Sequence, residues 1–142
     1  MALKDSDFGT VPFITIPSSK AKGDPLYDDR IVQMLGAVYP QSPLDCREII
    51  IQTKTLPSSH GRETRWPSPS NIKEHYSINQ SLTQNLKPTI ALVDDVLFTG
   101  AHFQAAKSVL QCNLPNQTII DLFLTRRRFG LSDDLSYFSS PI

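Results

Sequence analysis

The segment from Thr89 to Cys112 constrains the fold of this chain more than any other. It opens with an apolar, β-branched run, Thr89 to Val93, which predicts a strand. Two acids, Asp94 and Asp95, follow the run directly. After a short turn, apolar residues recur at helical spacing: Phe103, Ala106, Val109 and Leu110. A strand that passes through a tight turn into a helix is a building unit of α/β folds, so the segment predicts that class.

Three other apolar runs predict further strands, at Val11 to Ile16, Glu48 to Thr53 and Thr118 to Leu124. The second of these is apolar throughout its centre, which suits a sheet covered on both faces. A helix is expected from about Tyr27 to Val38, because apolar residues recur there at helical spacing and two acids lie near its start. The order of these elements predicts an open, mainly parallel α/β sheet with helices on both faces.

The size and charge of the chain limit what it can be. Its 142 residues and 15.9 kDa suit a single domain over residues 1–142. Hydrophobic residues make up 39% and charged residues 20%, which disfavours disorder. The 14 basic and 14 acidic side chains cancel, so no broad field attracts nucleic acid. The arginine cluster from Arg126 to Arg128 is a weak signal, better interpreted as a solvated strand end or a rim facing phosphate.

The first residues and the cysteines indicate a cytoplasmic protein. We expect no secretory signal, and no apolar stretch approaches the length of a membrane span, so no membrane partner is expected. Cys46 and Cys112 lie far apart, which excludes a short-spaced metal site, and one pair is too few for a secreted disulfide scaffold. Both are expected to be buried, reduced thiols.

A long polar loop, Leu56 to Pro69, interrupts the regular pattern. Loops of this length inside compact domains are usually functional or mobile. A plain surface loop and a lid with cations for phosphate both fit, and we prefer the lid because of three side chains: His60, Arg62 and Arg65. Ser70 is expected to cap a helix that begins near Asn71. Lys22 and Arg30 are interpreted as solvated charges or as partners of helix ends and of the core rim.

The turn after the acid pair is the predicted site. In open parallel sheets, ligands bind at the carboxyl ends of strands, where helix N-termini direct unpaired amides outward. The turn from Phe98 to Ala101 contains small residues, so several N–H groups and one hydroxyl can surround a phosphate. Asp94 and Asp95 would repel that phosphate. They are better placed to accept hydrogen bonds from the vicinal hydroxyls of a ribose and to favour positive charge that develops nearby.

The segment from Thr89 to His102 resembles the phosphoribosyl-pyrophosphate-binding motif of type I phosphoribosyltransferases: a hydrophobic strand, two acids, an apolar residue, then Thr-Gly and a small residue. The resemblance extends more loosely over most of the chain. Its spacing is most similar to ComF-type and related orphan bacterial members. This resemblance implies a phosphoribosyltransferase-like, Rossmann-like fold of three layers and a role in nucleotide metabolism.

The resemblance also implies roles for individual residues. Asp94 and Asp95 would hold the ribose hydroxyls as the catalytic pair. The 5-phosphate loop would consist of Leu97, Phe98, Thr99, Gly100, Ala101 and His102. Pyrophosphate would be contacted by Ser18, Ser19 and Lys20, with substrate-bound Mg2+ bridging its oxygens. The loop from Leu56 to Pro69 would close over the reacting centre, because water must be kept from a ribosyl cation.

Two departures from the family pattern keep the function open. His102 stands where many members have Ser or Thr, and its ring can donate to the phosphate or crowd it. Phe98 stands where hypoxanthine-guanine enzymes carry a carboxylate, which argues against a 6-oxopurine acceptor. Two functions are therefore expected as alternatives: transfer of a phosphoribosyl group to or from a nitrogenous base, or a non-catalytic module that binds phosphoribosyl pyrophosphate or a nucleotide.

The tail from Phe129 onward contains Leu131, Leu135, Tyr137 and Phe138. These apolar side chains suit packing on the domain itself or against a second subunit in a homodimer. The sequence does not decide between the two.

Overall fold

A computed structural model of the chain describes residues 9–38, 40–56, 68–97 and 100–126. At its centre lies a parallel sheet of four strands in the order β2-β1-β5-β6. The strands are β1 (Phe13–Thr15), β2 (Cys46–Arg47), β5 (Thr89–Leu97) and β6 (Thr118–Arg126). The predicted parallel sheet of an α/β fold is therefore confirmed.

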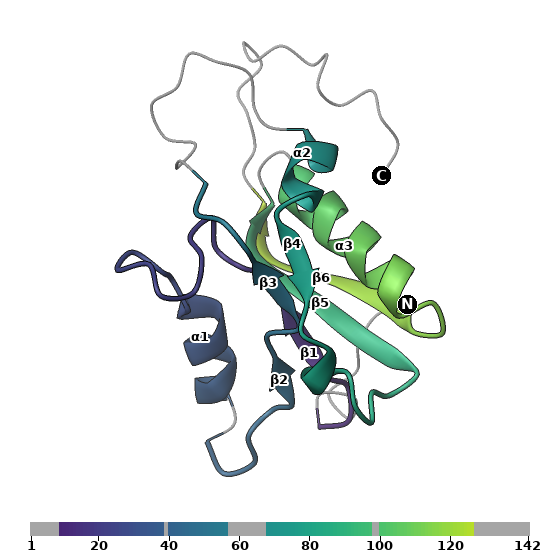
Figure 1. The fold of residues 1–142 in the computed structure, drawn as a ribbon. Coiled ribbons are helices and arrows are strands. Elements are labelled where there is room, and N and C mark those ends of the chain that lie inside the picture. Colours follow the sequence, from purple (N-terminus) through teal and green to yellow (C-terminus); the bar gives the residue numbers. More distant parts are fainter. Residues whose placement is uncertain (1–8, 39, 57–67, 98–99, 127–142) are drawn as a thin grey trace.

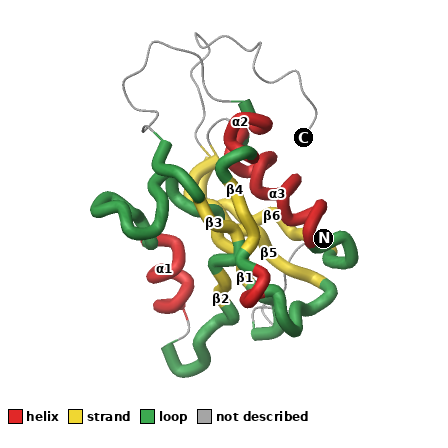
Figure 2. Tube along the Cα trace, viewed as in Figure 1, coloured by secondary structure: helices red, strands yellow, loops and turns green. Residues whose placement is uncertain are grey.

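Helices cover both faces of this sheet, as predicted (Figure 1 and Figure 2). α1 (Arg30–Val38) lies on one face, and α2 (Pro69–Lys73) and α3 (Ala101–Asn113) lie on the other. Successive residues of a strand pack on opposite faces of the sheet. Phe13 belongs to the core cluster that contains Leu35 of α1, whereas Ile14 belongs to the cluster that contains residues of α3. Burial on both sides explains why these strands are apolar without alternation.

The predicted strand from Glu48 to Thr53 is wrong as a single element of the parallel sheet. The structure has β2 just before it and a second short strand, β3 (Ile50–Gln52), within it. β3 pairs antiparallel with β4 (Tyr76–Ile78) in a separate sheet of two strands. Neither β4 nor the 3-10 turn η2 (Gln80–Leu82) was predicted, because elements this short carry too little periodicity.

β2 and β3 belong to different sheets because of how the chain leaves the parallel sheet after β2. The guanidinium of Arg47 donates to the carbonyl oxygens of Leu82 and Gln84 at 3.0 and 2.6 Å, which ties the end of β2 to the segment before β5. Ile49 and Ile50 then enter the core with α3 residues instead of extending β2. An apolar run indicates burial, but burial alone does not say in which sheet a strand pairs.

Side chains that cap helices explain the other differences in boundaries. α1 begins later than predicted, at Arg30, because the Asp28 carboxylate accepts a hydrogen bond from the backbone N–H of Arg30 at 3.1 Å. α2 begins at Pro69, with Ser68 as its cap in place of Ser70. A proline suits the first position of a helix, where an N–H group would have no intrahelical partner.

Strand β5 runs further than predicted, and its length decides where the acid pair lies. It continues through Asp94 and Asp95 to Leu97, paired with β6. Its other neighbour, β1, ends at Thr15 opposite Val93. Beyond Val93, no described strand pairs with the β1 side of β5. The acids therefore lie at the carboxyl edge of the sheet, next to the loop that follows β1.

None of the helices in the described part of the chain combines the length and the apolar character needed to cross a membrane.

Candidate functional site

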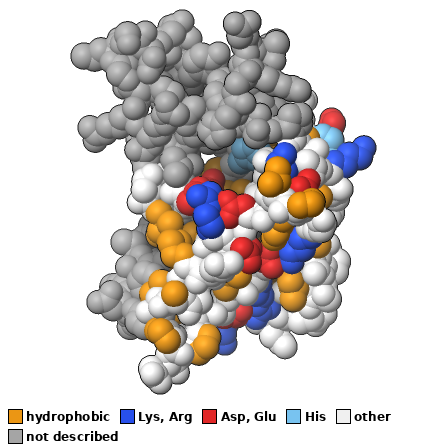
Figure 3. All heavy atoms as spheres, turned by 90° about the vertical axis from the view of Figure 1, so that its left-hand side faces the viewer, with side chains coloured by type: hydrophobic (Ala, Val, Ile, Leu, Met, Phe, Trp, Pro, Cys, Tyr) orange, Lys and Arg blue, Asp and Glu red, His pale blue; other side chains and the backbone are white. Residues whose placement is uncertain are grey.

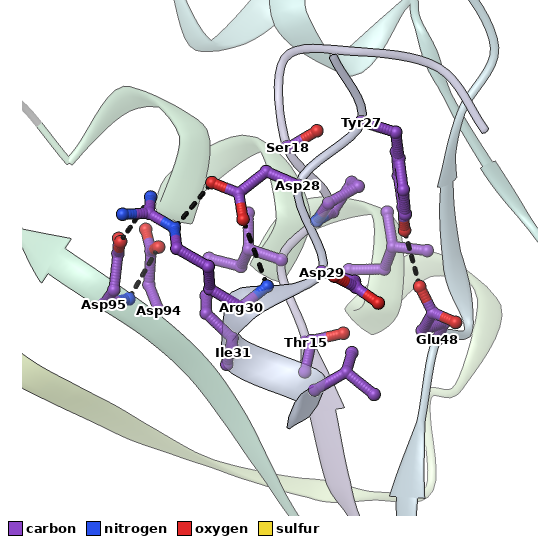
Figure 4. Close-up of a pocket in the computed structure, with 14 residues that line it drawn as sticks. Thr15, Ser18, Tyr27, Asp28, Asp29, Arg30, Ile31, Glu48, Asp94 and Asp95 are labelled. Atoms are coloured by element: carbon purple, nitrogen blue, oxygen red, sulfur yellow. Dashed lines mark hydrogen bonds and ion pairs between the residues drawn. The ribbon is translucent and has the colours of Figure 1, made fainter. Parts of the chain in front are cut away.

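An open pocket lies at the carboxyl edge of the parallel sheet, where the sequence predicted a site (Figure 4). Its walls come from the end of β1 with the loop after it, from the start of α1, from the segment that leads into β3 and from β5 at Asp94 and Asp95. Residues that line it include Thr15, Ser18, Asp28, Arg30, Asp94 and Asp95. The pocket therefore unites segments that lie far apart in the sequence.

Asp94 and Asp95 both line the pocket, and Figure 4 shows their carboxylates side by side. Both side chains are half-buried. Each interacts with a different layer of the fold. The charge of Asp94 contributes to a raised pKa of Tyr76 on β4, whereas Asp95 forms an ion pair with Arg30 of α1. The acid pair thus lies between the two layers, and it is open to a ligand in the pocket.

Burial has a large effect on Asp94. Burial is the main cause that raises the pKa of this carboxyl from 3.8 to about 7, and the negative charge of Asp95 contributes to the same rise. The backbone N–H of Asp95 donates to Asp94 Oδ1 at 2.9 Å, which favours the ionised form but does not offset the burial. Near neutral pH, Asp94 therefore exchanges between a carboxylate that only accepts hydrogen bonds and an acid that also donates one.

Arg30 lies between Asp28 and Asp95 in the pocket (Figure 4). Its Nε is 2.6 Å from Asp28 Oδ2, and its Nη2 is 3.4 Å from Asp95 Oδ2. The contact with Asp28 is local, whereas the contact with Asp95 joins the start of α1 to the end of β5. The side chain is 76% exposed, so it is solvated as the sequence indicated. The sequence did not indicate that it reaches the acid pair.

The pocket is strongly acidic. Among the described residues that line it, Arg30 is the one basic residue and five are acidic: Asp28, Asp29, Glu48, Asp94 and Asp95. Glu48 is already engaged, because Tyr27 and Lys22 donate to it at 2.5 and 2.8 Å. Figure 3 shows acidic and basic side chains gathered near the centre of the α1 side of the molecule. A bare polyanion would be repelled here, whereas one that carries a bound cation would not.

Of the residues predicted to contact pyrophosphate, only Ser18 is among the described residues that line the pocket. Its hydroxyl accepts a hydrogen bond from the backbone N–H of Lys20 at 3.2 Å. The Lys20 ammonium donates to the carbonyl oxygen of Leu56 at 3.3 Å, and the carbonyl oxygen of Ser19 accepts from the Leu56 N–H at 2.7 Å. Ser19 and Lys20 therefore hold the segment after β3 against this loop.

The predicted phosphate loop is described only at its two ends. Leu97 is the last residue of β5, and Phe98 and Thr99 lie outside the described residues. Gly100 precedes α3 with φ 74° and ψ −1°, a left-handed conformation that glycine adopts without strain. Ala101 and His102 then open the helix, whose first turn directs N–H groups away from the helix body. α3 therefore begins four residues after the end of β5, so a helix follows this strand and its acid pair in the predicted order.

A buried hydrogen bond joins β4 to the start of α3. Tyr76 Oη lies 3.0 Å from His102 Nδ1, and Tyr76 is only 8% exposed. Burial raises the pKa of Tyr76 and lowers the pKa of His102, so both side chains are neutral at pH 7. Sequence reasoning missed Tyr76, because it lies on an unpredicted strand and its partner is far along the chain.

We expect Tyr76→Phe to destabilise the protein by about 1 kcal/mol, because it removes a buried hydrogen bond and leaves His102 Nδ1 without its described partner. Urea denaturation at pH 7 measures the change. Tyr27→Phe is the control: it removes a hydroxyl that is less buried, so its effect should be smaller. A loss below about 0.3 kcal/mol for Tyr76→Phe would contradict the role given to this hydrogen bond.

The other predicted site residues fall outside the described parts of the chain: His60, Arg62 and Arg65 of the long loop. The arginine cluster is described only at Arg126, which ends β6. Over the described ranges, no group of three or more His, Cys, Asp or Glu side chains is arranged to hold a metal ion.

Both cysteines are free, as predicted. Cys46 is half-buried, so its predicted burial holds only in part. This partial burial raises the pKa of its thiol to about 11, so it is unreactive at neutral pH. The predicted burial of Cys112 is wrong, because Cys112 is exposed. It follows the buried Leu110 by two positions, which turns it to the other side of α3.

Compared with models of protein families, with curated proteins and with solved structures, the chain has no significant match.

Proposed function

We propose that the pocket binds a 5-phosphoribosyl group and that the protein is a phosphoribosyltransferase-like enzyme, which transfers this group from phosphoribosyl pyrophosphate to a nitrogenous base or catalyses the reverse reaction. The observation that carries the proposal is the position of Asp94 and Asp95 in a pocket at the carboxyl edge of the sheet, beside the loop after β1 and the start of α1. The proposal includes a single domain over residues 1–142 that works in cytoplasmic nucleotide metabolism.

A ribose suits the acid pair. Its two vicinal hydroxyls are hydrogen-bond donors on adjacent carbons, and each carboxylate has oxygens to accept from one of them. The half-buried position of both acids strengthens such bonds, since water competes less for them. Their negative charge also favours the positive charge that develops at C1 of the ribose in the transition state.

The transfer itself needs little covalent chemistry from the protein. The bond from C1 to the pyrophosphate oxygen breaks, and its electron pair leaves with pyrophosphate. The lone pair of the base nitrogen forms the new bond to C1, and the nitrogen passes its proton to solvent or to the leaving group. The protein contributes position and electrostatic stabilisation, which Asp94 and Asp95 supply beside the reacting carbon.

The 5-phosphate would bind in the turn from Leu97 to His102. Helix N-termini favour anions through their N–H groups and through the helix dipole, and α3 begins directly after this turn. Left-handed Gly100 supports the proposal, because a residue without a side chain lets the backbone approach a ligand closely. His102 contributes a ring that is neutral at pH 7 and tied to Tyr76.

Pyrophosphate would enter the pocket as its magnesium complex. The acidic side chains that line the pocket would repel bare pyrophosphate, whereas Mg2+ bound to substrate oxygens reduces that charge. Ser18 lies in the pocket to contact the complex, with Ser19 and Lys20 beside it in the same loop. We further propose that the loop from Leu56 to Pro69 supplies His60, Arg62 and Arg65 around the reacting centre.

Calorimetry with phosphoribosyl pyrophosphate and Mg2+, followed by a pyrophosphate-release assay over a panel of nucleobases, tests the proposal. We expect the donor to bind and at least one base to release pyrophosphate. Asp95→Asn should lower affinity and turnover at least about tenfold, because a charged acceptor for a ribose hydroxyl is lost. Its free energy of unfolding should change by less than about 1 kcal/mol, since Asp95 is half-exposed.

Two outcomes would change the assignment. Binding of the donor without pyrophosphate release from any base would replace the enzyme by a non-catalytic module that holds phosphoribosyl pyrophosphate or a nucleotide. If the protein binds none of phosphoribosyl pyrophosphate, ribose 5-phosphate and nucleoside monophosphates, the proposal is wrong for the whole pocket.

A further inference from the structure

The carboxylate of Asp28 holds Arg30 in two ways. Its Oδ1 accepts the backbone N–H of Arg30 at 3.1 Å, and its Oδ2 lies 2.6 Å from Arg30 Nε. The same side chain therefore sets the first residue of α1 and the direction of that residue's guanidinium. In Figure 4 the guanidinium extends from Asp28 towards Asp95, with Nη2 at 3.4 Å from Asp95 Oδ2. An exposed arginine held by two carboxylates has fewer accessible orientations than a free one.

Arg30 is also the main described source of positive charge for the acid pair. The titratable and charged groups that face the pair, by lining the pocket with it or by interacting with it from β4 and α3, are Tyr27, Asp28, Asp29, Arg30, Glu48, Tyr76 and His102. Tyr27, Tyr76 and His102 are neutral at pH 7, because burial raises the pKa of both tyrosines and lowers that of the histidine. The others except Arg30 are carboxylic acids. Asp94 and Asp95 are adjacent, and the negative charge of Asp95 makes ionisation of Asp94 less favourable.

We infer that Arg30 is a positioning residue of the pocket: anchored by Asp28, its guanidinium holds the Asp95 carboxylate and balances the charge of the acid pair, which keeps both acids able to accept hydrogen bonds from a ligand. The identity of that ligand as a ribose rests on the proposed function. Arg30 acts through Asp95, so its effect on binding should depend on the Asp95 charge.

A titration of the ligand-free protein tests the charge balance directly. The carboxyl carbons of Asp94 and Asp95 are followed by NMR from pH 4 to 9 in wild type, Arg30→Ala and Arg30→Lys. We expect Arg30→Ala to move the midpoint of the pair upward by at least about 0.5 pH units, because a cation near the ionised form is lost. Arg30→Lys should give a smaller shift, since lysine keeps the charge but lacks the planar fork that contacts two carboxylates.

The matched control is Lys107→Ala. Lys107 pairs with Asp121 at 2.8 Å on α3 and β6, and neither residue is among those that line the pocket. The variant removes one positive charge, as Arg30→Ala does, and it should leave the midpoint of the acid pair in place. An unchanged midpoint in Arg30→Ala, or an equal shift in Lys107→Ala, would overturn the inference.

Binding of ribose 5-phosphate at pH 7 tests the dependence on Asp95. Arg30→Ala should weaken binding about fivefold in the wild-type background, the size expected for one exposed ion pair. In the Asp95→Asn background the same change should weaken binding less than about twofold. An equal effect in both backgrounds, or tighter binding by Arg30→Ala, would contradict an action through Asp95. If wild type does not bind ribose 5-phosphate, the proposed function fails, while the carboxyl titration still decides the role of Arg30.

Discussion

Replacing Asp94 by asparagine is expected to stabilise the protein at pH 8 and to remove most of its ligand binding at the same time. Binding of ribose 5-phosphate should fall by about 30-fold or more, because the amide replaces a charged acceptor of a hydroxyl hydrogen bond. Stability should rise because the ionised carboxylate is costly at this half-buried position. Substitution of a residue that only packs in the core would not raise stability and weaken ligand binding together.

The pH dependence of the gain follows from the raised pKa of Asp94. In the unfolded chain the carboxyl titrates near its ordinary value of 3.8, whereas in the folded protein it titrates near 7. Between these values the folded state binds the additional proton, so the contribution of Asp94 to stability is complete below pH 3.8 and is lost as the pH rises through about 7. Asp94→Asn has no carboxyl to ionise and so has no such loss. Its free energy of unfolding should exceed that of wild type by about 1–3 kcal/mol at pH 8.

Guanidinium denaturation of wild type and Asp94→Asn at pH 4 and pH 8 measures this difference. The advantage of the variant should be small at pH 4 and large at pH 8. Asp121→Asn serves as the control, because Asp121 is paired with Lys107 away from the pocket. That variant should lose a few tenths of a kcal/mol and bind ribose 5-phosphate normally. An Asp94→Asn protein that is less stable than wild type at pH 8, or that binds within twofold of it, would contradict the assignment.

A second substitution, Gly100→Ala, should act in the opposite direction on stability. Gly100 has φ 74°, where an L side chain crowds the backbone, so alanine should cost about 1–2 kcal/mol. The backbone will relieve part of this strain by moving the turn that leads into α3. We therefore also expect binding of ribose 5-phosphate to weaken about tenfold, since its phosphate would depend on the N–H groups at this helix start.

Gly36→Ala is the matched control for this change. Gly36 lies inside α1 without a positive φ, and a Cβ built there would meet no atom within 4 Å. Alanine should stabilise that helix by about 0.5–1 kcal/mol and leave binding unchanged. Urea denaturation and calorimetry of the two variants give the comparison. If both substitutions change the free energy of unfolding in the same direction, the left-handed conformation of Gly100 is not the cause of its effect.

The expected results share a physical basis. Asp94 is a carboxyl whose ionisation is opposed by its surroundings, and Gly100 is held in a conformation that other residues rarely adopt. Both features lower or constrain stability, and both lie at the carboxyl edge of the sheet. Proteins commonly accept such costs where they bind ligands, because a site must leave charges and backbone amides ready for a partner.

The sequence by itself determined the elements that local chemistry specifies. The apolar run from Thr89 to Val93, the acids after it and the helical spacing after Gly100 are contiguous, so their order predicted β5, the acid pair and α3. The parallel sheet with helices on both faces followed from the same alternation. Such features depend on the side-chain period of a strand or a helix, which a single segment carries within itself.

Only the tertiary structure decided which distant groups meet. β1 ends opposite Val93 and leaves the acids at an open edge, Arg30 reaches Asp95, and Tyr76 on an unpredicted strand bonds to His102. The apolar run around Ile50 was visible in the sequence, yet its antiparallel partner was not. The reason is physical: hydrophobic burial is non-directional and short segments encode little periodicity, so strand partners and contacts across layers depend on how the whole core packs.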